Sequence, residues 1–155
     1  MPLLRTVAGF PGLSYSRDRG ANWTDPVPLT RTPGAADVVP HPRAANLVWK
    51  LSRGPHAGRF LHWHHNHPGT GYLGRNPCYL SGGVEEVGPD GPVVRWGEPR
   101  VVLFSPDPAV RVSYPDLVED PSGRLFLTAT QKTVARVHEV DAGLIDTLFA
   151  GLSRE

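Results

Sequence analysis

The sequence predicts an all-β fold built from repeated blades, and two observations support this prediction. Short apolar runs alternate with turns along the 155-residue chain, which contains 17 prolines and 17 glycines. The pattern W-x-[D/E]-P followed by an apolar run occurs twice, over residues 23–29 and again over residues 96–103. Such a repeat is typical of the blades of a β-propeller. A β-sandwich remains the alternative, because two copies define a repeat only weakly.

Each expected strand is a short apolar run between turn signals. A different pattern closes the chain, because apolar side chains recur at helical spacing over residues 141–152 and Asp141 stands at the N-cap position. We therefore expect one short amphipathic helix after the last strand. The expected strands cover residues 12–15, 26–29, 46–52, 59–65, 76–80, 93–96, 100–104, 113–119, 124–130 and 133–140.

Charge and composition argue against several classes of protein. The net charge of +1 gives no basic surface for nucleic acid. No apolar run approaches the roughly 18 residues that a membrane-spanning helix requires, so no membrane insertion is expected. The single cysteine, Cys78, excludes an internal disulfide and leaves the redox compartment open. Residues 1–5 are too short for a signal peptide, so the protein is either cytoplasmic or secreted through an upstream signal.

One eight-residue stretch is the most informative motif: Ser16, Asp18, Gly20 and Trp23 spell S-x-D-x-G-x-x-W. These residue types suit a tight hairpin, because Asp18 can accept hydrogen bonds from backbone N–H groups two residues on and Gly20 can adopt positive φ. Trp23 supplies an apolar plate whose ring N–H needs a partner. The motif resembles the Asp-box, the hairpin signature of the bacterial sialidase-like (BNR-repeat) glycoside hydrolases.

The resemblance implies a six-bladed β-propeller. A blade takes roughly 40–50 residues, so residues 1–155 would hold about three blades, as the C-terminal portion of a longer propeller. We expect a degenerate second Asp-box hairpin over residues 81–96, after the first one at residues 16–23. Uncovered blade edges would favour self-association.

A second segment resembles the Y-S-x-L motif that lies late in sialidases, with Tyr114 at the tyrosine position and Pro115 where serine is usual. In that family the tyrosine is the catalytic nucleophile, so the resemblance implies this role for Tyr114 and a substrate-binding role for the nearby Asp116. A neutral nucleophile avoids repulsion from the carboxylate of a sialic acid. It needs a base, because free tyrosine has a pKa of about 10. The alternative is a half-buried tyrosine of a strand.

Arginine is the side chain that binds a carboxylate through two parallel hydrogen bonds. Sialidases use three such arginines, and the resemblance implies that Arg75 is one of them. Arg111 precedes Tyr114 by three residues and is expected at the surface, although it could contribute. Asn66 and His65 end an expected strand, and the resemblance implies that they bind sugar hydroxyl groups.

Histidines gather at residues 62–67 and raise the question of a metal site. Alternation along a strand places His62 and His64 on one face and His65 on the other. Zinc needs three or four converging ligands, and no cysteine or carboxylate pair accompanies these histidines. We therefore expect no metal and no cofactor; a histidine metal site is the weakest alternative.

The resemblance implies an exo-acting glycosidase that removes a terminal anionic sugar from a glycan, which would be its partner. The chain departs from the family pattern, because neither residues 46–52 nor residues 59–65 contain the carboxylate that should activate the tyrosine. In sialidases, the acid/base aspartate and the first of the three arginines belong to early blades of the propeller. The chain alone is expected to be inactive. A non-catalytic glycan-binding or scaffold propeller is the alternative.

Overall fold

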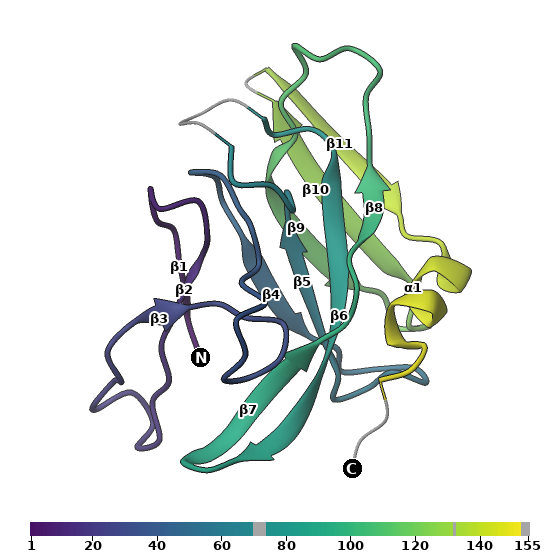
Figure 1. The fold of residues 1–155 in the computed structure, drawn as a ribbon. Helices are drawn as coiled ribbons and strands as arrows, with labels where there is room; N and C mark the ends of the chain where they lie inside the picture. Colours follow the sequence, from purple (N-terminus) through teal and green to yellow (C-terminus); the bar gives the residue numbers. More distant parts are fainter. Residues whose placement is uncertain (70–73, 132, 153–155) are drawn as a thin grey trace.

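The computed structural model describes residues 1–69, 74–131 and 133–152. Three antiparallel sheets of three, five and three strands are followed by one short helix (Figure 1). The prediction of a mostly β chain with a short C-terminal helix is confirmed. The elements are β1 (Leu3–Leu4), β2 (Gly12–Leu13), β3 (Val27–Pro28), β4 (Leu47–Lys50), β5 (Phe60–His64), β6 (Cys78–Gly88), β7 (Gly91–Trp96), β8 (Arg100–Leu103), β9 (Ser113–Glu119), β10 (Leu125–Gln131), β11 (Val134–Glu139) and α1 (Ala142–Phe149).

Strand β6 is the one expected strand whose length differs greatly from the prediction. It continues through Gly82 and Gly83 to Gly88, where a tight turn leads into β7. These glycines look like turn residues in the sequence, but each one lies where another part of the protein approaches the backbone closely. A Cβ atom on Gly82 would overlap the carbonyl oxygen of Leu148 in α1, and one on Gly83 would lie 2.6 Å from the ring of Trp96.

The two larger sheets are antiparallel meanders in chain order. The order in the central sheet is β4-β5-β6-β7, and β8 pairs with the first residues of β6 beyond the end of β7. The other meander is β9-β10-β11. The ends of the two first strands, β4 and β9, are joined, because the backbone N–H of Ser52 donates to Oε2 of Glu119 at 2.8 Å. The first strands of the two meanders therefore meet at one place.

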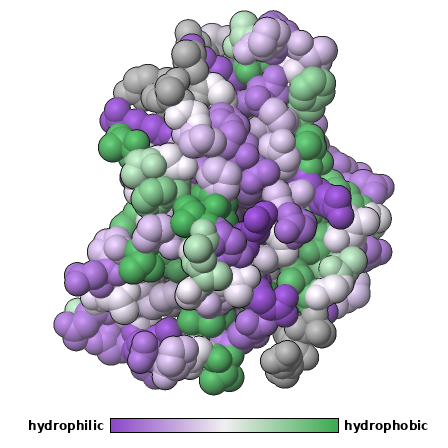
Figure 2. Space-filling view, viewed as in Figure 1, coloured by the Kyte–Doolittle hydropathy of each residue, from purple (hydrophilic) through white to green (hydrophobic). Residues whose placement is uncertain are grey.

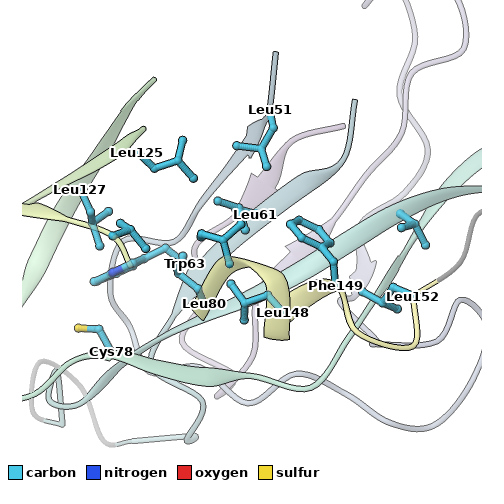
Figure 3. Close-up of a cluster of buried hydrophobic side chains, with 13 residues drawn as sticks. Leu51, Leu61, Trp63, Cys78, Leu80, Leu125, Leu127, Leu148, Phe149 and Leu152 are labelled. Carbon is cyan, nitrogen blue, oxygen red and sulfur yellow. The ribbon is translucent and has the colours of Figure 1, made fainter. Parts of the chain in front are cut away.

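The main core lies between the central sheet, β10 and α1 (Figure 3). Leu61, Trp63 and Leu80 point into it from β5 and β6, while Leu127 and Leu148 enter from β10 and α1. All five are at most 2% exposed. Burial of each large apolar side chain contributes about 1.5–3 kcal/mol, so this contact holds the two meanders and the helix together.

Helix α1 begins as predicted, because the Asp141 side chain accepts a hydrogen bond from the Leu144 N–H at 2.9 Å. It ends at Phe149, before the predicted end at residue 152. Gly151 takes a φ of 75°, a left-handed conformation that terminates helices. Leu152 is nevertheless 5% exposed and belongs to the main core. The apolar pattern therefore correctly indicated that Leu152 is buried, although this residue lies beyond the end of the helix.

The Asp-box residues form the loop between β2 and β3. Gly20 has the expected positive φ, 96°, and the ring N–H of Trp23 donates to the Gly20 carbonyl at 3.1 Å. The predicted hydrogen bonds of Asp18 are wrong in detail. The Ser16 hydroxyl accepts from the Gly20 N–H, whereas Asp18 accepts from the Asn22 N–H, four residues on. The bonds from Asn22 hold the pKa of Asp18 at about 2.

The two W-x-[D/E]-P copies share local structure but differ in burial. A strand begins four residues after each tryptophan, since β3 begins at Val27 and β8 begins at Arg100. Trp96 is 4% exposed and packs in a second apolar cluster with Leu13 and Leu29. Trp23 is 51% exposed. The two copies of the repeat therefore follow a similar backbone path, but their tryptophans pack differently.

We expect Gly82→Ala to destabilise the protein by about 3 kcal/mol, because the added methyl group meets the backbone of α1. Gly97→Ala is the matched control: its nearest contact is Cδ1 of Leu152 at 2.9 Å, the end of a flexible side chain, and the Leu148 carbonyl oxygen lies 3.3 Å away, farther than from a Cβ atom on Gly82. This control should lose about 1 kcal/mol. Urea unfolding measures both values. Equal losses would mean that α1 does not contact β6 as described.

Candidate functional site

Four chain segments converge at the candidate site: the loop before β4, the end of β5, the start of β6 and the start of β9. The Val112 N–H donates to the Arg75 carbonyl at 2.9 Å, which joins the approach to β9 to the approach to β6. His65, directly after β5, has its Nδ1 3.1 Å from the Pro77 carbonyl. The loop before β4 also takes part, because Nη2 of Arg75 donates to the Arg43 carbonyl at 3.2 Å. Four segments thus surround Arg75 and His65.

Arg75 is nearly buried, at 9% exposure, and its Nη1 lies 3.4 Å from the Ser113 hydroxyl. It lines a cavity of about 330 Å³ together with Gly74, Asn76 and residues 108–111. Arg111 is exposed, as the sequence predicted, and it lines the same cavity. The structure therefore brings together the two arginines that sequence reasoning singled out.

Asn76 attaches the segment that leads to Arg111. Its side-chain amide donates to the Ser105 carbonyl at 2.7 Å, and its Oδ1 accepts from the Ser105 N–H at 3.0 Å. Both bonds join the start of β6 to the end of the β8 region. Because the chain runs from Ser105 to Arg111 in a few residues, these bonds set where the second arginine can lie.

Tyr114 occupies a β-bulge at the start of β9. Ser113 pairs with Thr130 and Asp116 pairs with Thr128, so two residues of β9 face one residue of β10. Tyr114 has a φ of 49°, an unusual conformation for a residue with a bulky side chain, and it is 59% exposed. Among the described residues, nothing hydrogen-bonds to its hydroxyl, and it does not line the Arg75 cavity.

The remaining predicted site residues have different surroundings. Asn66 is half-buried and has a φ of 52°. Three non-glycine residues of the described chain have positive φ, and two of them, Asn66 and Tyr114, are predicted site residues. His65 is fully buried, so it can support the site but cannot reach a sugar from the surface. Asp116 is exposed, and its carboxylate accepts from the Leu117 N–H at 2.8 Å.

A cluster of buried histidines lies behind the site. His62, His64, His65 and His41 are each at most 2% exposed. The rings of His62 and His64 stack with centroids 4.6 Å apart, and those of His41 and His65 stack at 5.5 Å. Parallel rings direct their nitrogen lone pairs alongside one another and not toward a shared point. Within the described ranges, no three His, Cys, Asp or Glu side chains are placed to hold a metal ion.

Burial keeps these histidines neutral. Desolvation lowers the pKa of His41 to about 4 and those of His64 and His65 to about 3. It lowers the pKa of His62 as well, and both ring nitrogens of His62 lack a hydrogen-bond partner among the described residues. The cluster therefore behaves as a set of small aromatic core side chains at neutral pH. Protonation would place positive charges inside the protein.

Sequence reasoning missed a second cavity, of about 630 Å³, between α1, the turn before β10 and residues 55–56. On its wall, Nε2 of His56 lies 2.7 Å from Oδ1 of Asp146. The His56 ring stacks on Phe149 with centroids 4.5 Å apart. Ninety residues separate the paired side chains, and no local pattern in the sequence connects them.

The surface and the comparisons add three further findings. Figure 2 shows several separate hydrophobic patches among hydrophilic residues on the face it displays. In the part of the chain described here, no helix has the length and apolar character needed to cross a membrane. Comparisons with family models, with curated proteins and with solved structures find no match. The function is therefore argued from the residues and their geometry.

We expect stability to fall steeply as the pH drops below about 6.5. The unfolded chain takes up protons on its histidines near pH 6.5, whereas in the folded chain His41, His64 and His65 bind them only near pH 3–4. Burial lowers the pKa of His62 well below its ordinary value. Between pH 7.0 and 5.5 each buried histidine then lowers the free energy of unfolding by about 1.2 kcal/mol, and all four together by about 5 kcal/mol. Urea unfolding at the two pH values measures this loss.

His62→Phe is the informative variant for this prediction, because phenylalanine keeps the stacked ring without a titrating group. Its pH-dependent loss should be about one quarter smaller than that of the unchanged protein. His138→Phe, on β11 and outside the cluster, is the control. A similar reduction in both variants would show that burial of His62 does not cause the pH dependence.

Proposed function

We propose that this chain is part of a sialidase-like β-propeller that binds an anionic sugar of a glycan. The observation that carries the proposal is the cavity lined by Arg75 and Arg111. None of the described residues that line it is acidic, so two guanidinium groups set its charge. Planar guanidinium groups favour carboxylates, which they bind through two parallel hydrogen bonds.

The size and walls of the cavity fit this role. A volume of about 330 Å³ is at the lower end of ligand pockets, so it suits a single sugar residue and not a long oligosaccharide. Arg75 donates to the Ser113 hydroxyl and to the Arg43 carbonyl, and these contacts hold its guanidinium in place. An arginine that is already immobilised loses little conformational entropy on binding.

The arrangement of the sheets supports the propeller. Propeller blades are antiparallel meanders that place their first strands around a common axis. Here the central sheet and the β9-β10-β11 sheet are meanders in chain order, and the Ser52–Glu119 hydrogen bonds join the ends of their first strands. The Asp-box loop between β2 and β3 belongs to a third, smaller sheet. We infer that these three sheets correspond to three blades, of which the first is incomplete.

Arg111→Ala tests the binding proposal, because this exposed side chain can be removed without disturbing the core. The unchanged protein should bind a sialic acid-terminated trisaccharide more tightly than neutral lactose. We expect the variant to lose affinity for the sialoside by about tenfold, equivalent to 1.4 kcal/mol, because a charge-assisted contact is lost. NMR titration with both sugars gives the dissociation constants.

Arg5→Ala is the matched control, since Arg5 is an exposed arginine outside the cavity. It removes the same charge from the protein, so it reports any effect of net charge alone. The proposal fails if the two variants bind the sialoside equally well, or if the unchanged protein does not distinguish it from lactose.

Hydrolysis is a second candidate function, favoured by the conformation of Tyr114. Positive φ in a residue with a bulky side chain is costly, and such strain is concentrated at functional sites. The bulge at Tyr114 interrupts the regular alternation of side chains along β9, and the phenol is exposed. The absence of Tyr114 from the walls of the arginine cavity favours binding over hydrolysis, which is why hydrolysis comes second.

Tyr114→Phe tests the hydrolytic candidate with a fluorogenic sialoside. If the hydroxyl is the nucleophile, the variant should lose at least about 1,000-fold in turnover while it still binds the sialoside, because only the covalent step is removed. If the unchanged chain turns over the substrate and the Tyr114→Phe variant does so equally well, Tyr114 is not the nucleophile. Binding without any turnover in the unchanged chain would leave the glycan-binding function alone.

Self-association through uncovered sheet edges is part of the same proposal. Val87, Phe104 and Val137 are between 68% and 95% exposed. Apolar side chains on open β-structure favour contact between copies. Sedimentation across a range of protein concentrations would measure it.

A further inference from the structure

His41 uses both of its ring nitrogens in hydrogen bonds with the backbone. The His65 N–H donates to Nδ1 at 3.2 Å, and Nε2 lies 3.3 Å from the Ala44 carbonyl. A backbone N–H can only donate and a carbonyl can only accept. Nδ1 must therefore carry the lone pair and Nε2 the proton, so these two bonds require the neutral imidazole in one tautomer.

These bonds connect three segments of the candidate site. His41 begins the loop that precedes β4, and its own N–H donates to the Gly9 carbonyl at 2.8 Å. Two residues later, the Arg43 carbonyl accepts from Nη2 of Arg75. The same ring holds the backbone at His65, next to Asn66 at the end of β5. His41 thus joins the loop that supports Arg75 to the end of a central strand.

Among the described residues, the titratable or charged groups that influence His41 are histidine rings and one arginine. The ring of His65 stacks on it, and His62, His64 and His67 on β5 and its extension are its other histidine neighbours. Arg75 approaches from the start of β6. No described carboxylate contributes to the electrostatic environment of His41. The backbone at Ala44 and Ala45 favours the imidazolium form, but burial of the ring outweighs it and lowers the pKa of His41.

We propose that neutral His41 is a positioning residue whose protonation releases the loop at residues 41–44 and, with it, the support of Arg75. A proton on Nδ1 would turn the acceptor of the His65 N–H into a donor, and the two N–H groups would then face each other. The loop must move to separate them. The Arg43 carbonyl moves with the loop, and Arg75 loses one of its hydrogen-bond acceptors.

Hydrogen exchange at the His65 amide measures this release without any ligand. Burial lowers the pKa of His41 to about 4 from the ordinary value of about 6.5, so its protonation should raise the local opening constant about 30-fold between pH 7.5 and pH 5.0. The Leu127 amide in β10 reports opening of the main core, so a larger opening constant at His65 than at Leu127 shows that exchange at His65 is local. The expected result is an opening constant at His65 that exceeds the one at Leu127 and rises about 30-fold as the pH falls to 5.0.

His41→Asn separates protonation from general acid sensitivity. The amide oxygen of asparagine can accept the His65 N–H in place of Nδ1, but it does not titrate. The opening constant at the His65 amide should then lose this dependence on pH, which is about 30-fold in the unchanged protein. His138→Asn is the matched control and should retain the full dependence. Equal pH dependence in His41→Asn and the unchanged protein overturns the proposal.

A direct measurement on the unchanged protein covers the case in which His41→Asn fails to fold. Nitrogen-15 NMR of the histidine rings reports both the tautomer and the titration. We expect His41 to carry its proton on Nε2 at pH 7.5 and to stay neutral well below pH 6. Titration near pH 6.5, or a proton on Nδ1, contradicts the proposal.

The consequence for the ligand rests on the proposed function. A bound sialoside should oppose the opening, so at about ten times its dissociation constant it should lower the His65 opening constant at pH 5.0 about tenfold. If no sialoside binds, the binding function fails while the exchange measurement still decides the role of His41. If the sialoside binds and leaves the His65 opening constant unchanged, His41 does not position Arg75.

Discussion

The pairing of β6 with three other strands is the constraint on which the rest of the structure depends. On one side it pairs with β5, and on the other it pairs first with β8 and then with β7. Helix α1 packs directly on the backbone of β6 at Gly82, so the apolar residues of the helix close the core between the two meanders. The first residues of β6 also follow Arg75 in the chain. A single strand therefore determines the position of the helix, the shape of the core and the start of the candidate site.

The buried histidines connect this core to the site. They lie on β5 and in the loop before β4, where aliphatic residues would be equally buried and would cost less to desolvate. What histidine adds is hydrogen-bonding capacity at the end of the strand. His41 and His65 bond to backbone groups of neighbouring segments, while His62 and His64 stack as aromatic core residues. The same rings that fill the interior thus also fix the loops that carry Arg75 and Asn66.

Much of the fold could be predicted from local patterns. Every expected strand overlaps an observed one, and the N-cap at Asp141 is correct, because apolar alternation and capping are properties of neighbouring residues. The length of β6 was not predicted. Gly82 leaves room for α1 and Gly83 leaves room for the ring of Trp96, but in the sequence such glycines cannot be distinguished from glycines of a turn. For the site, the sequence identified Arg75, Arg111 and Tyr114 by residue type. It did not predict that the two arginines share a cavity without Tyr114, because that depends on how β6 and β9 approach each other.

The sequence by itself determined the secondary-structure class, the positive φ of Gly20 in the Ser16–Trp23 loop and which side chains are arginines suited to an anion. Each of these follows from side-chain chemistry and short-range spacing. Only the tertiary structure decided the tautomer of His41, the strained backbone at Tyr114 and the pairing of His56 with Asp146. These features join residues that lie between 24 and 90 positions apart or depend on a bulge against a neighbouring strand. Burial and long-range contacts arise when the sheets pack, so no local pattern can specify them.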